Sequence, residues 1–291
     1  MKPPEKIECA WRNNIRLEET PMLNFKEAPW KIILVQLVAS TILLSVTNLV
    51  LFPSPIFDPI ARATGGLING TLQANLLTIL LFSLIVFGWG KLHPADVGLD
   101  WTKLGQGFSL TALLWLAMQA IMLLISWLSG EVRLDPTWGE RGVPAVLGAL
   151  IGQLAGNAFF EEMNYRGFYL SQFYLKLKKV SERRRMTLAI LTMLGLFILS
   201  HIPNRIFGGY TLADIPLDFA LLFAYGLFFT AIYLLSGNLF LAIGVHALIN
   251  RPTLLTEAPI PAQALLFLLT CILLAVLRRR KRPYQQQVLA A

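Results

Sequence analysis

The segment at residues 32–52, IILVQLVASTILLSVTNLVLF, contains no charged residue, and similar apolar segments recur along the chain. A helix needs about 20 predominantly apolar residues to cross the hydrocarbon core of a bilayer. Hydrophobic residues make up 55% of the 291 residues and charged residues only 14%, whereas soluble domains carry about 25% charged residues. Folding alone cannot remove so much apolar surface from water. We therefore predict an all-α polytopic membrane protein.

We expect a bundle of about eight transmembrane helices in a single membrane domain. The expected spans lie near residues 32–52, 71–90, 105–128, 143–170, 187–203, 217–235, 238–255 and 261–277. The membrane domain, residues 32–277, then follows a cytoplasmic N-terminal segment, residues 1–31, and precedes a basic tail, residues 278–291. Cys9 and Cys271 lie at opposite ends of the chain and indicate neither a disulfide framework nor a metal cluster.

Lysine and arginine are unevenly divided between the two sides of this eight-span arrangement. The side that holds both termini carries 19 of the 25 Lys and Arg residues, the other side carries five, and Arg166 lies within a span. Because Lys and Arg favour the cytoplasmic side, we expect a multi-pass protein of a bacterial inner or plasma membrane with both termini cytoplasmic. The net charge of +8 then indicates contact with anionic lipid headgroups, and no nucleic-acid partner is expected.

The fourth span carries small and polar residues in a regular pattern. Gly148, Gly152 and Gly156 recur every four residues, and such a row forms a flat groove against which another helix can pack closely. Packing alone is the favoured interpretation of these glycines. Asn157 and Asn164 flank Glu161 at helical spacing, so we expect this polar stripe to face the interior of the bundle.

Two adjacent carboxylates stand out in the same span. Each ionisable residue near the centre of a membrane helix costs roughly 2.5–3.5 kcal/mol on insertion scales. Glu162 precedes Arg166 by four residues, the favoured order for an ion pair on a helix, so these two can offset each other. Glu161 is left as the unmatched carboxylate. A buried carboxylate without a cationic partner is a candidate general base.

Two of the three histidines also lie in apolar spans. His201 is near the end of the fifth span, while His246 and Asn250 are one helical turn apart in the seventh. A single buried histidine is more often a structural residue. Here Glu161 and His201 each lie twenty residues from Ser181, at the expected turn between spans four and five. An antiparallel helix pair therefore places them at similar depth, and we expect one shared polar cavity.

Three short motifs, each on its own apolar helix, carry a resemblance to a known family. EEMNYR at 161–166 fits a Glu-Glu-x-x-x-Arg pattern, FILSH at 197–201 fits Phe-x-x-x-His, and HALIN at 246–250 fits His-x-x-x-Asn. Over residues 140–255 the chain resembles the CPBP family of intramembrane proteases, which includes the CAAX prenyl endopeptidases and the bacteriocin-processing and immunity (Abi) proteins. The resemblance implies an eight-helix fold, peptide hydrolysis, and a peptide or membrane-protein substrate within the lipid bilayer.

The resemblance also implies a role for each motif residue. Glu161 and His201 would hold and deprotonate a water molecule, while His246 and Asn250 would donate hydrogen bonds to the oxyanion. Glu162 and Arg166 would fix the geometry. The family is often described as metalloproteases, so zinc or another divalent metal could be bound by His201, His246 and Glu161. The same residues can act without a metal, and no His-Glu-x-x-His helix is present.

Two functions from other classes remain open. Buried Glu, Arg and His can also form a transport pathway, although no pair of interrupted helices recurs between the two halves of the chain. A non-catalytic membrane scaffold or immunity protein would act by binding partners. The variant Glu161→Gln separates the alternatives, because a protease loses all processing and a scaffold keeps its function.

Overall fold

The computed structural model describes residues 25–290, with side chains for residues 25–279. In this part of the chain the residues form helices and loops, apart from one isolated bridge between Leu134 and Thr256. The predicted N-terminal segment therefore lies largely outside the described residues, as does Cys9. Cys271 is a free, exposed cysteine.

The all-α membrane fold predicted from the sequence is confirmed. Seven helical segments are long and apolar enough to cross a membrane: Trp30–Leu51, Gly70–Trp89, Trp101–Leu128, Val143–Lys176, Glu182–Phe207, Ile215–Ser236 and Ala262–Arg279. They contain α1 (Trp30–Val46), α3 (Gly70–Phe82), α4 (Leu104–Leu128), α6 (Val143–Gly152), α7 (Ala158–Glu161), α8 (Leu170–Lys176), α9 (Glu182–Leu199), α10 (Ile202–Phe207), α11 (Ile215–Ser236) and α13 (Ala262–Ala290). Two short helices, α2 (Asp58–Ala63) and α5 (Thr137–Arg141), lie in loops.

The seventh predicted span is shorter than expected. Helix α12 covers only Leu239–Asn250, and twelve residues extend about 18 Å at 1.5 Å each, against a hydrocarbon core of about 30 Å. The predicted span ran on to residue 255. Pro252 has no backbone N–H and Thr253 has a positive φ of 50°, so the helix ends before them. Except for Asn250, every residue of α12 is buried, and neighbouring helices enclose it.

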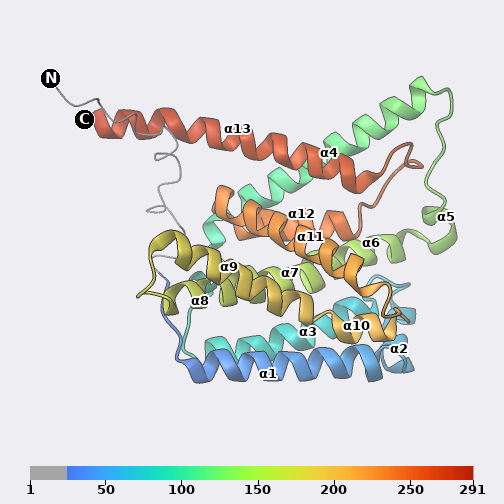
Figure 1. The fold of residues 1–291 in the computed structure, drawn as a ribbon. Coiled ribbons are helices and arrows are strands. Elements are labelled where there is room, and N and C mark those ends of the chain that lie inside the picture. The colour runs from blue at the N-terminus through green and yellow to red at the C-terminus, as the bar shows by residue number, and fades with distance from the viewer. Residues whose placement is uncertain (1–24, 291) are drawn as a thin grey trace.

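The helices lie side by side and run between two ends of the bundle (Figure 1). We call the end that holds the start of α1, the turn between α8 and α9 and the end of α13 the proximal end. The distal end holds α2, α5 and α10. Residues 26 and 91 meet at the proximal end through a hydrogen bond from Lys26 Nζ to the Lys91 carbonyl. The start of α1 and the end of α13 thus share one end, as the predicted arrangement of the termini requires.

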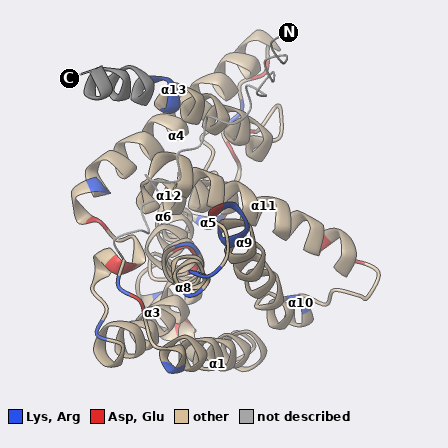
Figure 2. Cartoon of the chain, turned by 60° about the vertical axis from the view of Figure 1, so that its left-hand side comes forward, with Lys and Arg blue, Asp and Glu red and all other residues tan. Residues whose placement is uncertain are grey.

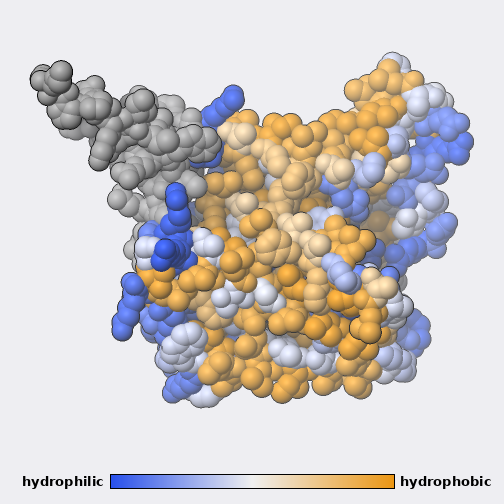
Figure 3. Space-filling model, viewed as in Figure 1, coloured by the Kyte–Doolittle hydropathy of each residue, from blue (hydrophilic) through white to orange (hydrophobic). Residues whose placement is uncertain are grey.

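Polar and apolar surfaces are arranged along the line between these two ends. An apolar belt lies between polar surfaces at the two ends (Figure 3), and the charged residues gather near the helix ends (Figure 2). At the proximal end Lys176 Nζ and Lys178 Nζ lie 2.8 and 2.5 Å from the carboxylate of Glu27. These hydrogen bonds, that of Lys176 first, lower the pKa of Glu27. The ion pairs hold the turn that follows α8 against the residues that precede α1.

The glycine row of the fourth span forms the predicted packing groove. A Cβ atom on Gly148 would lie 2.1 Å from the carbonyl oxygen of Gly66, and one on Gly152 would lie 2.9 Å from the Asn69 side chain. Gly156 lies against Leu72 and Asn75 of α3 in the same way. The absence of side chains therefore lets α3 and the residues before it approach the span that carries the two glutamates.

This span is not a regular α-helix. Its α-helical parts alternate with two π-helical segments, η7 (Gln153–Asn157) and η8 (Glu162–Tyr169). In a π-helix each backbone hydrogen bond joins residues that are five apart in sequence, and such segments are often found at functional sites. The wider turn changes the direction in which each following side chain points. Within η8, Glu162 and Arg166 still meet at the four-residue spacing that the sequence predicted.

Candidate active site

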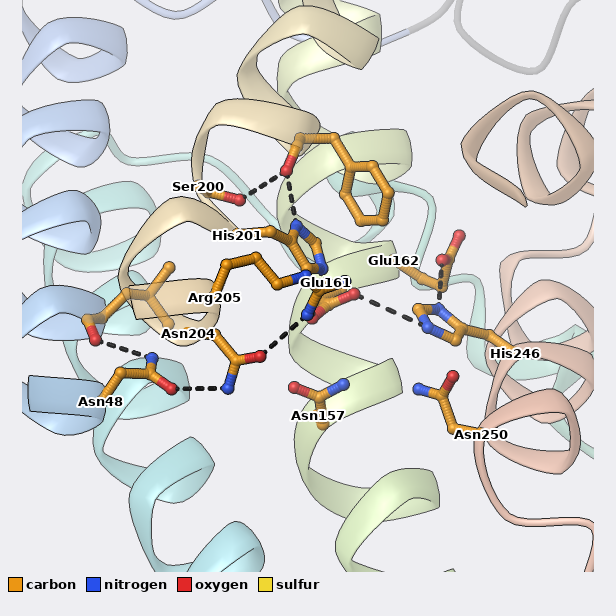
Figure 4. Close-up of polar contacts among 12 residues, drawn as sticks. Asn48, Asn157, Glu161, Glu162, Ser200, His201, Asn204, Arg205, His246 and Asn250 are labelled. Carbon is orange, nitrogen blue, oxygen red and sulfur yellow. Dashed lines mark hydrogen bonds and ion pairs between the residues drawn. The ribbon is translucent and has the colours of Figure 1, made fainter. Parts of the chain in front are cut away.

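Glu161, His201 and His246 come together from three separate helical segments (Figure 4). The Nε2 atom of His201 lies 3.9 Å from Glu161 Oε1, and the Nε2 atom of His246 lies 3.6 Å from Glu161 Oε2. The three side chains are largely buried, with 16%, 4% and 14% of the His201, His246 and Glu161 side chains exposed. The convergence expected from the sequence is therefore present, with the glutamate between the two imidazole rings.

Each histidine is oriented by a partner on its other ring nitrogen. His201 Nδ1 lies 2.7 Å from the carbonyl oxygen of Phe197. A carbonyl can only accept, so this nitrogen carries a hydrogen. His246 Nδ1 lies 2.7 Å from Glu162 Oε1, and a carboxylate likewise accepts. In a neutral ring the Nε2 atom then has a free lone pair, and in both histidines that lone pair is directed toward Glu161.

The predicted pair of Glu162 and Arg166 is present and entirely buried. Arg166 Nη1 lies 3.1 Å from Glu162 Oε1, and neither side chain is exposed. The second amino group, Nη2, donates to the Gly226 carbonyl of α11 at 3.0 Å. Glu162 therefore joins the guanidinium to the ring of His246. This arrangement fixes the position of His246 relative to the fourth span.

Aromatic rings support the site from two sides. Phe229 of α11 stacks on the His246 ring with centroids 4.2 Å apart, and Phe197 meets the His201 ring edge-on at 4.6 Å. The Arg166 guanidinium lies 4.5 Å from the Phe197 ring centre and 5.6 Å from that of Phe229. Phe197 is the first residue of the Phe-x-x-x-His motif at 197–201. Phe229 is missed by sequence reasoning, because a phenylalanine in an apolar span carries no distinguishing signal.

The amide residues divide between the cavity and the protein interior. Asn157 and Asn250 both line the cavity beside Glu161, and both donate to Gln153 Oε1, at 3.3 and 2.9 Å. Asn164 is completely buried and accepts a hydrogen bond from Gln36 of α1 at 3.1 Å. It lies within the π-helical segment η8. The predicted polar stripe thus points inward throughout, but only its first two residues reach the cavity.

A cavity of about 710 Å³ contains the site. Its polar lining includes residues that sequence reasoning missed, among them Asn48, Asn204 and Arg205. Asn204 Nδ2 donates to Asn48 Oδ1 at 2.9 Å, and Arg205 Nε lies 2.8 Å from Asp218 Oδ2. The sequence does show these residues as polar positions near the ends of apolar spans. Residues in such positions usually contact headgroups or water, so they were not predicted to line a cavity.

The predicted zinc ligands are His201, His246 and Glu161, which lie together in the cavity. Two imidazole nitrogens and a carboxylate are chemically suitable zinc ligands. Among the described residues, however, no three His, Cys, Asp or Glu side chains are arranged to hold a metal ion. The residues as placed do not fit a bound metal, and we derive no reaction step through one. Metal dependence stays a prediction.

Comparison with protein families gives one match. Residues 143–251 match the family described as type II CAAX prenyl endopeptidase Rce1-like. The matched region begins at α6 and ends after α12, so it contains all three motifs and every residue of the Glu161, His201 and His246 cluster. Comparisons with curated proteins and with solved structures found no match.

Proposed function

We propose that this chain hydrolyses a peptide bond with a water molecule activated by Glu161, because residues 143–251 match the family described as type II CAAX prenyl endopeptidase Rce1-like. The match supports a CAAX-protease-like intramembrane endopeptidase at the family level. The specific mechanism is supported by one observation above all: a buried carboxylate lies between two oriented imidazole rings, inside a cavity within the membrane-spanning bundle.

The spacing around Glu161 suits a bridging water molecule. The two Nε2–Oε distances are 3.6 and 3.9 Å, which is longer than a direct hydrogen bond of about 2.7–3.2 Å. A water oxygen can lie within hydrogen-bond reach of both atoms of either pair. Such a water donates one hydrogen to the Glu161 carboxylate and the other to an imidazole lone pair. Its own lone pair is then free to attack a carbonyl carbon.

The reaction that follows needs only the side chains present. Glu161 removes a proton from the water as its oxygen forms a bond to the carbonyl carbon of the substrate. The carbonyl π bond opens, and its electron pair becomes the oxyanion. Glu161 next gives its proton to the nitrogen of the scissile bond. The C–N bond then breaks, leaving a carboxylic acid and an amine.

Donors for the oxyanion are available on α12. Asn250 Nδ2, which now donates to Gln153 Oε1, lies at the cavity wall and can turn toward a substrate oxygen. His246 Nε2 can donate only when its ring carries both hydrogens, and Glu162 on Nδ1 then supplies the counter-charge. Oriented donors of this kind stabilise the transition state in a site that excludes water.

The variant Glu161→Gln tests the proposal. Glutamine keeps the size of the side chain and removes its ability to take a proton, so we expect peptide cleavage to fall at least ~100-fold, as for loss of a general base. Peptides from membranes that contain the wild type or the variant are compared by mass spectrometry. Glu140→Gln, an exposed residue of α5, is the matched control and should leave the peptide pattern unchanged. Wild-type cleavage in Glu161→Gln would refute the mechanism.

A further inference from the structure

The side chain of Asn250 is not held in place by packing. Asn250 is the last residue of α12 and is exposed, whereas every other residue of this helix is buried. Its carboxamide lines the cavity that contains Glu161, and Figure 4 shows it below His246. A side chain in such a position can adopt several rotamers unless a hydrogen bond selects one. The contacts of its amide group therefore decide the direction in which Asn250 donates.

The main chain that follows Asn250 is held by side chains of α4 and α5. Trp115 donates to the carbonyl oxygens of residues 252 and 253 at 3.1 and 3.2 Å, and Trp138 donates to that of residue 254 at 2.6 Å. Gln119 donates to the carbonyl of residue 253 at 3.2 Å and accepts from the N–H of residue 255 at 3.0 Å. Together with α12, which precedes it, this network fixes the backbone of Asn250. The remaining freedom at this position is the rotation of the Asn250 side chain.

Gln153 of the fourth span is the acceptor that restrains this rotation. Asn250 Nδ2 donates to Gln153 Oε1 at 2.9 Å. The same oxygen accepts a hydrogen bond from Asn157 Nδ2 at 3.3 Å. This second bond lies within the fourth span, so it holds the half-buried Gln153 side chain in place while Gln153 bonds across to α12. None of the three motifs contains Gln153.

The bond to Gln153 also sets the direction of the second hydrogen on Asn250 Nδ2. A carboxamide nitrogen carries two hydrogens, and both lie in the plane of the amide group. In Asn250 one of them is bonded to Gln153, and the other has no acceptor among the described residues. The side chain can turn about the bond to Gln153 without breaking it. The second hydrogen then reaches a substrate oxygen in the cavity.

We propose that Gln153 is a positioning residue, which holds the Asn250 amide so that its second hydrogen faces the oxyanion. The proposal rests on the proposed function, in which Asn250 donates to that oxyanion. A donor that is oriented before the reaction needs no reorganisation in the transition state. Gln153 therefore affects the rate through Asn250 and need not touch the substrate. Its effect falls on kcat and not on KM, because the interaction that it prepares is made in the transition state.

Hydrogen exchange of the Asn250 amide tests the orientation without any need for catalysis. The protein is labelled with ¹⁵N-asparagine and placed in lipid nanodiscs, and the Asn250 side-chain signals are identified by their loss in Asn250→Ala. In Gln153→Leu and in Gln153→Ala these hydrogens should exchange with water about threefold faster or more, as for the loss of one hydrogen bond. Gln153→Glu keeps an acceptor oxygen and should exchange as the wild type does. Unchanged exchange in Gln153→Leu and Gln153→Ala, or equally fast exchange in Gln153→Glu, would overturn the proposal.

A double-mutant cycle tests the effect on the reaction. The substrate is a membrane peptide whose cleavage is lost in Glu161→Gln. Gln153→Leu should lower kcat about tenfold with little change in KM, a smaller effect than the ~100-fold loss on removal of an oxyanion donor. Added to Asn250→Ala, the same substitution should lower kcat no further, because Gln153 acts through Asn250. An equal loss of kcat in that background, or a change confined to KM, would overturn the proposal.

Gln263→Leu is the matched control for both experiments. Gln263 of α13 lines the same cavity, and among the described residues no hydrogen bond joins it to Asn250. Its replacement should leave the exchange and kcat as in the wild type, and effects equal to those of Gln153→Leu would overturn the proposal. Faster exchange in Gln153→Leu with no peptide hydrolysed by the wild type would refute the proposed function and leave the orientation of Asn250 by Gln153 established.

Discussion

Arg166→Met should destabilise the protein strongly, because Arg166 is the one Lys or Arg among the described residues that contacts the buried carboxylate of Glu162. Both side chains of the Glu162–Arg166 pair have no exposed area, and Nη1 lies 3.1 Å from Oε1. Removing one partner of a buried ion pair costs about 3–5 kcal/mol of unfolding free energy. We expect a loss near the lower limit, about 3 kcal/mol, because His246 still bonds to Glu162 at 2.7 Å. The Gly226 carbonyl also keeps a donor, Thr230 Oγ1.

A double-mutant cycle isolates the effect of the stranded charge. In Glu162→Gln/Arg166→Met the carboxylate is replaced by a neutral amide. The double variant should therefore lose about 1–3 kcal/mol less unfolding free energy than the two single variants lose in sum. Unfolding free energies are measured by steric trapping of the purified protein in bilayer discs.

The pair Asp58–Arg62 supplies the control for this cycle. It has the same four-residue spacing, but its side chains are 52% and 75% exposed, so Arg62→Met should cost less than about 1 kcal/mol. A similarly small loss in Arg166→Met, or strict additivity in the cycle, would show that burial of the Glu162–Arg166 pair does not govern its energetics.

Three further predictions concern packing, charge and metal. Gly148→Leu should lower the unfolding temperature in a thermal melt, because its Cβ would overlap the Gly66 carbonyl, whereas Gly105→Leu, with open space around it, should not. Glu27→Gln should reduce stability slightly at neutral pH. Because the pKa of Glu27 is lowered in the folded state, its contribution is present above the unfolded value of about 4.5 and is lost as the pH falls below it; melts of both proteins from neutral to acid pH should converge. The zinc prediction requires about one zinc per chain by elemental analysis, lost in His246→Gln, and full activity of a metal-free sample would refute it.

The contribution of local sequence is clear at the motif residues. Long apolar runs predicted the spans, since hydrocarbon burial depends on composition and length and not on which helix lies alongside. The Glu162–Arg166 contact was also predicted from the four-residue spacing, and it is present although both residues lie in the π-helical segment η8. The similar depth of Glu161 and His201 followed from counting residues on either side of the turn near Ser181.

The rotation of each helix about its own axis and the contacts between helices were not predictable in this way. Asn164 contacts Gln36 of α1 and does not line the cavity, although its spacing from Glu161 placed it beside the cavity residues. The hydrogen bond from Asn204 to Asn48 also joins segments that are distant in sequence.

The sequence by itself thus determined a membrane helix bundle, the order of its spans and the residue types of the candidate site. The tertiary structure decided that both imidazole rings direct Nε2 toward Glu161, that Glu162 links Arg166 to His246, and that Asn157 and Asn250 line the same cavity. The physical reason is that insertion into lipid depends on local hydropathy, whereas the direction of a side chain depends on helix rotation. Rotation is set by close packing, such as that of Gly148 against Gly66, between segments that sequence spacing does not relate.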